Sequence, residues 1–380
     1  MKKILFICQT NNSLKGTEKT LGVLVNKLKA DYEIHYLAIN EESPALDISQ
    51  IEFHNLNMHT DVESGFIKKL SHLLKITLGI KKNITEINPD IVISSLDEIN
   101  IATGFMASKK NKRIFIATIH TNPEICLTGF KKVLAKLVFP KFHMIVCVSK
   151  GIEKSVREIV PNINTTTIYN AFSLQQSPVK KVTTLKKLIF VGNLNKFKGI
   201  HHLVRVIKHI PEETRPYLSI LGDGELRDPL EQYCLEEELH DWISFHGMVS
   251  NVYEHIKKAD ILVLPTYTEA FPLVPIEALK SGTPVITNDI HFGPAEILDT
   301  KIEVDQGYSK TSSGLLLLGP SLTEDKVSSF DNKLTPYENR LLKALIDSNE
   351  FEVDPLLCER FNVEEILPQW EDLFKNLCHV

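Results

Sequence analysis

The sequence predicts an α/β fold built from two doubly wound parallel-sheet domains. Short apolar runs alternate with helical stretches along the chain, and the alternation restarts after a polar stretch near residue 175. The 380 residues are also enough for two domains of ordinary size. Such alternation is typical of parallel sheets wound with helices on both faces. We expect domains over residues 1–174 and 175–360, and a helix within 361–380 that packs back on the first domain.

The first half contains short apolar runs that predict strands over residues 2–9, 32–39, 90–95, 112–119 and 144–149. A helix is predicted over 17–30, where four apolar residues recur at helical spacing: Leu21, Leu24, Val25 and Leu28. The stretch 170–186 is polar, weakly patterned and contains a proline, so it predicts a linker.

In the second half, strands are predicted over 187–193, 217–224, 243–247, 261–265 and 284–288. Helices are predicted over 201–210 and 226–237, and the tail 358–378 ends in an amphipathic helix.

Composition indicates a soluble globular protein, with 43% apolar and 24% charged residues. The sequence contains no window of 18 uninterrupted apolar residues, so no membrane span is predicted. The first apolar run is too short for a signal peptide. The six cysteines form no C-x-x-C pair, which indicates reduced, structural thiols and a cytoplasmic location. The 14 histidines form no H-x-x-x-H or H-E-x-x-H arrangement, so no metal site is expected.

The charge of the chain is unevenly distributed. Residues 1–170 carry a net charge of +6 and residues 171–380 carry −11. In the first half, the segments 65–82 and 130–142 interleave lysines with apolar residues. This pattern predicts peripheral contact with an anionic membrane surface, at the inner face of the cell membrane, and a lipid-linked acceptor. The alternative is an ordinary solvated helix face.

Ligands of open parallel sheets bind beyond the carboxyl ends of the strands, so the loops after strands are the places to search for a site. Residues 265–286 follow a predicted strand and contain a helix that we expect to start near Phe271. Its free N–H groups would favour an anion such as a phosphate. Glu269 and Glu277 flank this end, and carboxylates accept hydrogen bonds from paired hydroxyls. Alternatively, Glu269 only complements the helix dipole and Glu277 is a solvated helix residue.

Three other loops carry candidate residues. Gly192 ends a strand, where it lets the backbone approach a ligand. Lys198 precedes a helix N-terminus, a position that suits a lysine only if an anion lies between the lysine and the helix, and a solvated lysine is the alternative. Gly222 and Gly224 lie at a strand-to-helix turn whose spacing does not fit a dinucleotide fingerprint. Gly16 precedes a helix, and His120 follows a strand and is either structural or functional.

Together these motifs resemble the donor-binding domain of family 4 retaining glycosyltransferases, which have the GT-B fold of two Rossmann-like domains facing a central cleft. The resemblance covers roughly residues 188–298 and rests on the ordered set "FVGNLNKFKG", "LSILGDGEL", "ISFHGMVSN" and "TYTEAFPLVPIEALKSGTPVIT". The first half matches more loosely, through "KGTE", "TIHTNP" and "VCVSKGI".

The resemblance implies a role for each matching residue. Glu269 would contact the donor sugar, Glu277 the ribose, Lys198 the diphosphate and His120 the sugar near the reaction centre, and it implies catalytic roles for Lys198, Glu269 and His120. The rest of the implied donor site consists of residues that line the diphosphate or the base: Gly16, Gly192, Asn193, Gly222, Gly247, Met248, Val249, Ala270, Phe271, Pro272 and Leu273. The chain departs from the family at Asn193, where an arginine is usual, and at Lys15, where a second glycine is usual.

The implied activity is retaining, metal-independent transfer of a sugar from a nucleotide diphosphate to a hydroxyl, of hexosyltransferase type. A UDP-sugar is favoured over a GDP-sugar, the acceptor is a glycan or a lipid-linked saccharide in cell-surface polysaccharide synthesis, and no cofactor or nucleic acid is implied. The first domain would bind the acceptor and the second the donor. A GT-B sugar-nucleotide epimerase and a non-catalytic GT-B accessory subunit are the alternatives.

Overall fold

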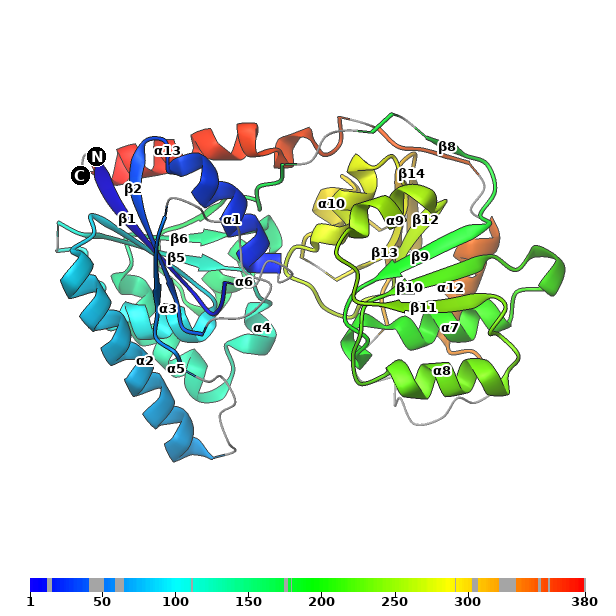
Figure 1. Ribbon diagram of the computed structural model, residues 1–380, viewed down its shortest axis with the longest axis horizontal. Helices are drawn as coiled ribbons and strands as arrows, with labels where there is room; N and C mark the ends of the chain where they lie inside the picture. Colours follow the sequence, from blue (N-terminus) through cyan, green and yellow to red (C-terminus); the bar gives the residue numbers. More distant parts are fainter. Residues whose placement is uncertain are drawn as a thin grey trace. The chain divides into compact units, whose positions relative to one another are not determined.

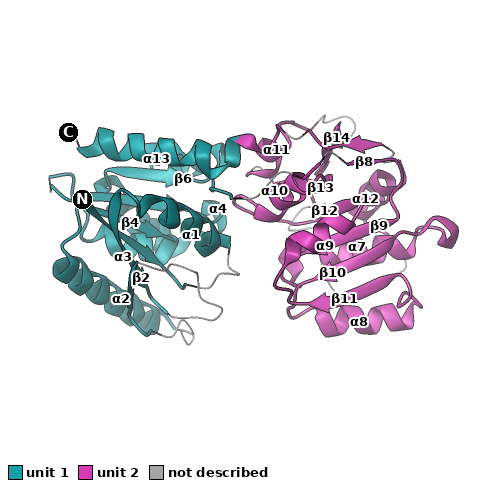
Figure 2. Ribbon diagram, turned by 45° about the horizontal axis from the view of Figure 1, so that its top comes forward, with its two compact units in different colours: residues 1–173, 360–380 teal, residues 174–359 magenta. Residues whose placement is uncertain are grey.

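A computed structural model describes residues 1–11, 16–40, 51–58, 65–110, 112–173, 177–178, 180–290, 292–302, 307–320, 333–347, 350–354 and 356–378. The chain divides into two compact units, one of residues 1–173 with 360–380 and the other of residues 174–359 (Figure 2). Among the described helices, none combines the length and the apolar character that crossing a membrane requires.

The first unit contains a parallel seven-stranded sheet in the order β3-β2-β1-β4-β5-β6-β7. Its strands are β1 (Lys2–Cys8), β2 (Tyr32–Ala38), β3 (Glu52–Asn55), β4 (Ile91–Ser95), β5 (Ile114–Ile119), β6 (Met144–Cys147) and β7 (Thr165–Thr167). Its helices are α1 (Gly16–Leu28), α2 (Phe66–Ile87), α3 (Asp97–Gly104), α4 (Pro123–Cys126), α5 (Gly129–Val138), α6 (Lys150–Ile159) and α13 (Val363–Cys378), with a 3₁₀ turn η1 (Phe139–Lys141).

The last helix, α13, completes the core of the first unit. Helix α13 contacts α1, while α2 and α5 both contact α3 (Figure 1). Trp370 and Phe374 of α13 share one buried cluster with Leu21 and Leu24 of α1 and with alternate residues of β1. Burial of these large side chains against the sheet accounts for why the chain returns to this unit after residue 359.

The second unit contains a seven-stranded sheet in the order β11-β10-β9-β12-β13-β15-β14, parallel except for the final hairpin. Its strands are β9 (Lys187–Val191), β10 (Tyr217–Leu221), β11 (Ile243–Gly247), β12 (Ile261–Leu264), β13 (Val285–Asp289), β14 (Tyr308–Thr311) and β15 (Gly314–Leu318). Its helices are α7 (Ile200–Lys208), α8 (Arg227–Glu236), α9 (Val252–Lys258), α10 (Leu273–Lys280), α11 (Pro294–Ile297) and α12 (Pro336–Asp347), with 3₁₀ turns η2 (Lys196–Lys198) and η3 (Glu212–Thr214). A further 3₁₀ turn, η4 (Glu359–Phe361), lies at the boundary where the chain returns to the first unit.

These sheets confirm the α/β prediction, and three local expectations change. The predicted linker 170–186 contains β8 (Lys181–Val182), which pairs antiparallel with β16 (Phe351–Glu352). Helix α10 begins at Leu273, two residues after the start expected near Phe271, because Pro272 has an extended backbone and forms the N-cap. The sequence prediction also missed β3, β7, the β14–β15 hairpin and α12, most of which are short or rich in polar residues.

Candidate active site

The loops after β9, β10 and β12 interlock at the carboxyl edge of the second sheet. Gly199 has φ +66°, and a Cβ there would lie 2.0 Å from the carbonyl oxygen of Pro265. The backbone N–H of Tyr267 donates to the carbonyl of Phe197 at 2.9 Å, which joins the same two loops. Gly222 has φ +130°, and a Cβ there would lie 1.9 Å from the carbonyl oxygen of Gly192. Both glycines are therefore needed for one loop to touch the next.

Lys198 and Glu269 form an ion pair at this edge. Lys198 ends the turn η2, whose start is capped by the Asn195 side chain accepting from the Lys198 N–H at 3.1 Å. The Lys198 ammonium contacts a carboxylate oxygen of Glu269, and each side chain keeps 26% of its exposure. Burial lowers the pKa of Lys198 to about 8, whereas the adjoining carboxylate favours the ammonium form. The interpretation of Lys198 as a solvated lysine is therefore wrong.

Helix α10 begins next to this ion pair. Pro272 is its N-cap, so the first-turn N–H groups of Leu273 and Val274 have no acceptor within the helix, and Pro275 has no N–H. Glu277, on the second turn, is only 5% exposed. The alternative of a solvated Glu277 is therefore wrong, because a buried carboxylate needs polar partners.

The loop from Ala270 to Pro272 packs tightly. Ala270, Phe271 and Pro272 are buried and Leu273 is half-buried. Gly293 has φ +77°, and a Cβ there would lie 3.0 Å from the Cα of Phe271 and from Pro272. The helix N-terminus is thus supported on its far side by the loop after β13.

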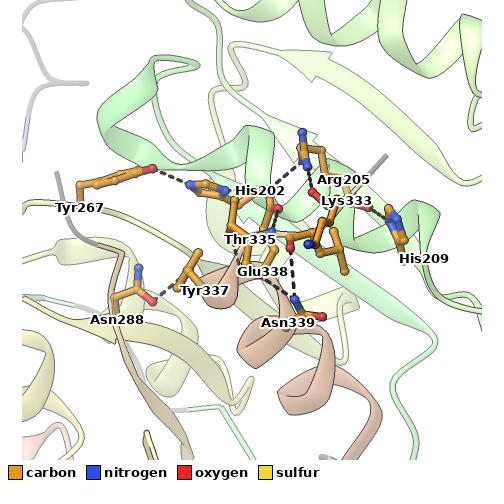
Figure 3. A network of polar contacts seen from close by, with 11 residues as sticks. His202, Arg205, His209, Tyr267, Asn288, Lys333, Thr335, Tyr337, Glu338 and Asn339 are labelled. Carbon is orange, nitrogen blue, oxygen red and sulfur yellow. Dashed lines mark hydrogen bonds and ion pairs between the residues drawn. The ribbon is translucent and has the colours of Figure 1, made fainter. Parts of the chain in front are cut away.

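A polar network connects the β12–α10 loop to helices α7 and α12 (Figure 3). His202 of α7 lies between two partners, with its Nε2 2.5 Å from the Tyr267 hydroxyl and its Nδ1 2.9 Å from a Glu338 carboxylate oxygen. Glu338 also forms a reciprocal capping box with Thr335 at the start of α12, at 2.8 and 3.2 Å. Fixing Tyr267 fixes the segment that ends in Glu269, two residues later.

A second branch of the network reaches the same loop. The Tyr337 hydroxyl donates to Asn288 at 3.0 Å (Figure 3). The Asn288 amide donates to the carbonyl of Thr266 at 2.9 Å. Asn288 is buried, and its bonds join β13, α12 and the loop after β12. The sequence prediction missed this network, although the T-x-x-E pattern at 335–338 is a capping-box signal.

The predicted base-proximal residues lie at the end of β11, an edge strand of the sheet. Gly247 is buried, Val249 is half-buried and Met248 is 63% exposed. An Nη1 atom of Arg227 would lie 3.2 Å from a Cβ on Gly247, so Arg227 is a cation at this edge that the sequence prediction missed. Arg227 forms ion pairs with Asp223 and Glu231.

Asn193, the position where the resembled family usually has arginine, is exposed. Its amide oxygen would lie 2.7 Å from a Cβ on Gly224. Gly192 and Asn193 thus help to form the contact with the β10 loop. Their roles toward a donor stay predictions.

His120 and Gly16 belong to the first unit. The Nε2 of His120 lies 3.0 Å from the Thr118 hydroxyl, which is itself within reach of the Ser94 carbonyl at 3.2 Å. If Thr118 donates to that carbonyl, His120 donates through Nε2–H and Nδ1 is a bare acceptor. Nδ1 has no hydrogen-bond partner among the described residues, and burial lowers the pKa of His120 to about 4. His120 is therefore a neutral acceptor at pH 7.

Gly16 is the first residue of α1, and its carbonyl accepts from Thr20 at 3.2 Å. The departure noted at Lys15 lies outside the described residues. Leu96, after β4, has φ +77°, which is unusual for a side chain of its kind and marks a strained position at the carboxyl edge of this sheet.

Comparison with known proteins identifies the domain that carries the ion pair. Residues 173–310 match the family described as glycosyl transferases group 1. An uncharacterized glycosyltransferase of Methanocaldococcus jannaschii is 29% identical over 61% of this chain and 63% of its own length. The N-acetylgalactosamine-N,N'-diacetylbacillosaminyl-diphospho-undecaprenol 4-alpha-N-acetylgalactosaminyltransferase of Campylobacter jejuni is 24% identical over 84% of this chain and 90% of its own. Residues 173–310 therefore form a domain of the glycosyl transferases group 1 type.

A solved structure shows the fold of the whole chain. HepE of Anabaena, in complex with UDP, superposes with a TM-score of 0.70 at 16% identity, over 99% of this chain and 100% of that chain. The fold is therefore GT-B. The group 1 match includes Lys198, Glu269 and Glu277, whereas His120 and Gly16 lie outside it.

Proposed function

We propose that this protein is a retaining glycosyltransferase that moves a sugar from a UDP-sugar to a hydroxyl of a glycan or lipid-linked acceptor in surface-polysaccharide synthesis. The observation that carries the donor part is the Lys198–Glu269 pair beside the N-terminus of α10, with buried Glu277 on the next turn. A cation and free N–H groups suit a diphosphate, and the two carboxylates suit hydroxyl groups on either side of it.

The nucleotide preference rests on relatives and not on a base contact in this chain. HepE was solved with UDP, and it shares the fold over the whole chain. The acceptor preference has a similar source, because the Campylobacter jejuni relative is named for a diphospho-undecaprenol substrate.

The proposed reaction breaks the bond between the anomeric carbon of the sugar and the diphosphate oxygen. The acceptor oxygen bonds to the same carbon on the same face, and its proton passes to the leaving diphosphate. Negative charge grows on that diphosphate, where Lys198 and the first-turn N–H groups of α10 would stabilise it. His120, neutral and with a bare Nδ1, would accept a hydrogen bond from a sugar hydroxyl. We propose that this transfer needs no metal, since the sequence has no Asp-x-Asp and Lys198 supplies a positive charge.

The proposed membrane contact rests on an exposed apolar face in the first unit. Large apolar side chains that point to solvent lie on α2 and α5, and they are Phe66, Ile67, Leu70, Leu74, Leu78, Phe130, Val133 and Leu137. The rings of Phe66 and Phe130 lie 5.1 Å apart, which joins the two helices into one surface. Lysines are interleaved with this face, and positive charge beside apolar side chains suits an anionic lipid surface.

A donor screen tests the proposed function. Purified protein is incubated with an undecaprenyl-diphosphate saccharide acceptor and with one UDP- or GDP-sugar at a time, and nucleotide release is measured. We expect acceptor-dependent release of UDP with at least one UDP-sugar, and NMR of the product should show the anomeric configuration of the donor. Release from GDP-sugars alone, or an inverted product, would contradict the proposal.

A further inference from the structure

A repeated Glu-x-His pattern lies on two neighbouring strands of the first unit. Glu33 and His35 lie on β2, and Glu52 and His54 lie on β3. In the parallel register, His35 pairs with Glu52 and Leu37 pairs with His54. Because side chains alternate along a strand, the two Glu-x-His pairs project from one face of the sheet.

The side chains meet around His35, which is 4% exposed. Its Nδ1 lies 3.0 Å from the Nε2 of His54 and 3.4 Å from a carboxylate oxygen of Glu52. One ligand atom from each of these three residues lies within 4.8 Å of the other two. The remaining nitrogen of His35, Nε2, lies 3.1 Å from a carboxylate oxygen of Glu33.

These distances fit a tetrahedral metal. Ligand atoms about 2.0–2.2 Å from zinc stand roughly 3.3–3.6 Å apart at tetrahedral angles. The separations of 3.0 and 3.4 Å therefore need only small side-chain movements. Glu33 takes the place of the carboxylate that commonly accepts from the second nitrogen of a metal-bound histidine, fixing its tautomer.

Without a metal, the histidines satisfy each other through a hydrogen bond. His35 donates from Nε2 to Glu33, which leaves its Nδ1 to accept from the Nε2–H of His54. In that state the lone pair of Nδ1 also faces the carboxylate of Glu52. Moving the proton of His54 to its own Nδ1 would turn all three facing atoms into electron-pair donors, as metal binding requires.

We propose that His35, His54 and Glu52 bind one Zn²⁺ ion, with Glu33 orienting His35 and a water molecule as the fourth ligand. Two imidazoles and one carboxylate suit zinc better than magnesium or calcium, which prefer oxygen ligands alone. The ion joins β3, the edge strand of the sheet, to β2. Its role is structural, and the inference does not depend on the proposed transfer reaction.

Metal titration of the untagged full chain tests this proposal. After EDTA treatment and removal of the chelator, Zn²⁺ is added in a calorimeter, and Co²⁺ is added while its visible absorption is recorded. We expect one equivalent of Zn²⁺ to bind and the Co²⁺ spectrum to have the intensity of a tetrahedral site. Glu52→Gln, at a side chain that is 72% exposed, should weaken Zn²⁺ binding at least tenfold without loss of folding.

Two further variants separate ligands from the surroundings. His54→Ala should abolish one-to-one binding, and His240→Ala, at an exposed histidine of the second unit, should leave it unchanged. Equal Zn²⁺ affinity in the parent and in Glu52→Gln and His54→Ala, or no binding by the parent, would overturn the proposal. Chelation should lower the melting temperature of the parent but leave initial transfer rates at 25 °C unchanged, so failure of this site and failure of the proposed function give different results.

Discussion

Replacing Lys198 with alanine removes the positive charge that the candidate site directs at the leaving diphosphate. Lys198 contacts Glu269 at the end of η2, and the side chain is held rather than freely solvated. Removing one preorganised group of this kind costs about 3 kcal/mol of transition-state stabilisation. We therefore expect kcat to fall roughly 150-fold in Lys198→Ala.

The assay is continuous detection of nucleotide release at saturating donor, with nucleotide affinity measured separately by calorimetry. Lys196→Ala is the matched control, because Lys196 lies in the same 3₁₀ turn and is exposed. Lys198→Arg keeps the charge and should recover part of the rate. A thermal melt measures how far the loss of the ion pair with Glu269 destabilises the second unit. The free energy of unfolding should fall by only about 1 kcal/mol.

Equal turnover in Lys198→Ala and Lys196→Ala would refute the reasoning. It would mean that Lys198 stabilises the transition state no more than the exposed Lys196 of the same turn does. Loss of nucleotide affinity with unchanged kcat would also contradict it. That result would mean that Lys198 binds the ground state and the transition state equally.

Four further predictions follow from the same structure. Because burial lowers the pKa of Lys198 to about 8, kcat/KM should fall as pH rises above 8, and this fall should be absent in Lys198→Arg; parallel profiles would contradict the assignment. Glu277→Gln should weaken UDP binding at least tenfold by calorimetry, with no change in melting temperature. Tyr267→Phe, which takes the hydroxyl from His202, should lower kcat about tenfold at unchanged UDP affinity, whereas Tyr217→Phe at an exposed site should not. Binding to anionic vesicles should be lost, and transfer to a soluble acceptor retained, when six lysines at roughly 1 kcal/mol each become glutamine; equal co-sedimentation with the parent would refute this for Lys68, Lys69, Lys75, Lys131, Lys132 and Lys136.

The sequence was sufficient to predict the buried strands of both sheets. Strands such as β1 and β4 are short apolar runs buried on both faces, which is a strong local signal. It was not sufficient for β3 and β7, where "EFHN" and "TTT" are short and half-exposed. Their pairing is set by neighbouring strands and not by their own composition. The β14–β15 hairpin was missed although its second strand is apolar.

The residues of the candidate site were selected from the sequence, but their contacts with one another were not predicted. Glu269 and Lys198 were chosen from separate loops, 71 residues apart, and nothing local in either loop indicates that they touch. The burial of Glu277 also depends on how α10 packs, which the sequence of one helix does not fix. The network behind Tyr267 was missed because α12 follows a long stretch without periodic apolar residues.

The strand order explains why these distant residues meet. In the second sheet, β9 has β10 on one side and β12 on the other, so the winding reverses between β9 and β12. Ligands of open parallel sheets bind at the carboxyl edge beside such a reversal. Lys198 follows β9 and Glu269 follows β12, so the ion pair lies at the reversal itself.

The first sheet has the same order around its own reversal, between β1 and β4. Gly16 follows β1, the strained Leu96 follows β4, and His120 follows β5, the next strand along. In both domains, the strand order alone is therefore enough to select the loops after the first and fourth strands. The strand order itself depends on long-range pairing, which the local sequence of a loop does not reveal. For that reason the residues of the candidate site could be selected from the sequence, but the contacts between them could not be predicted.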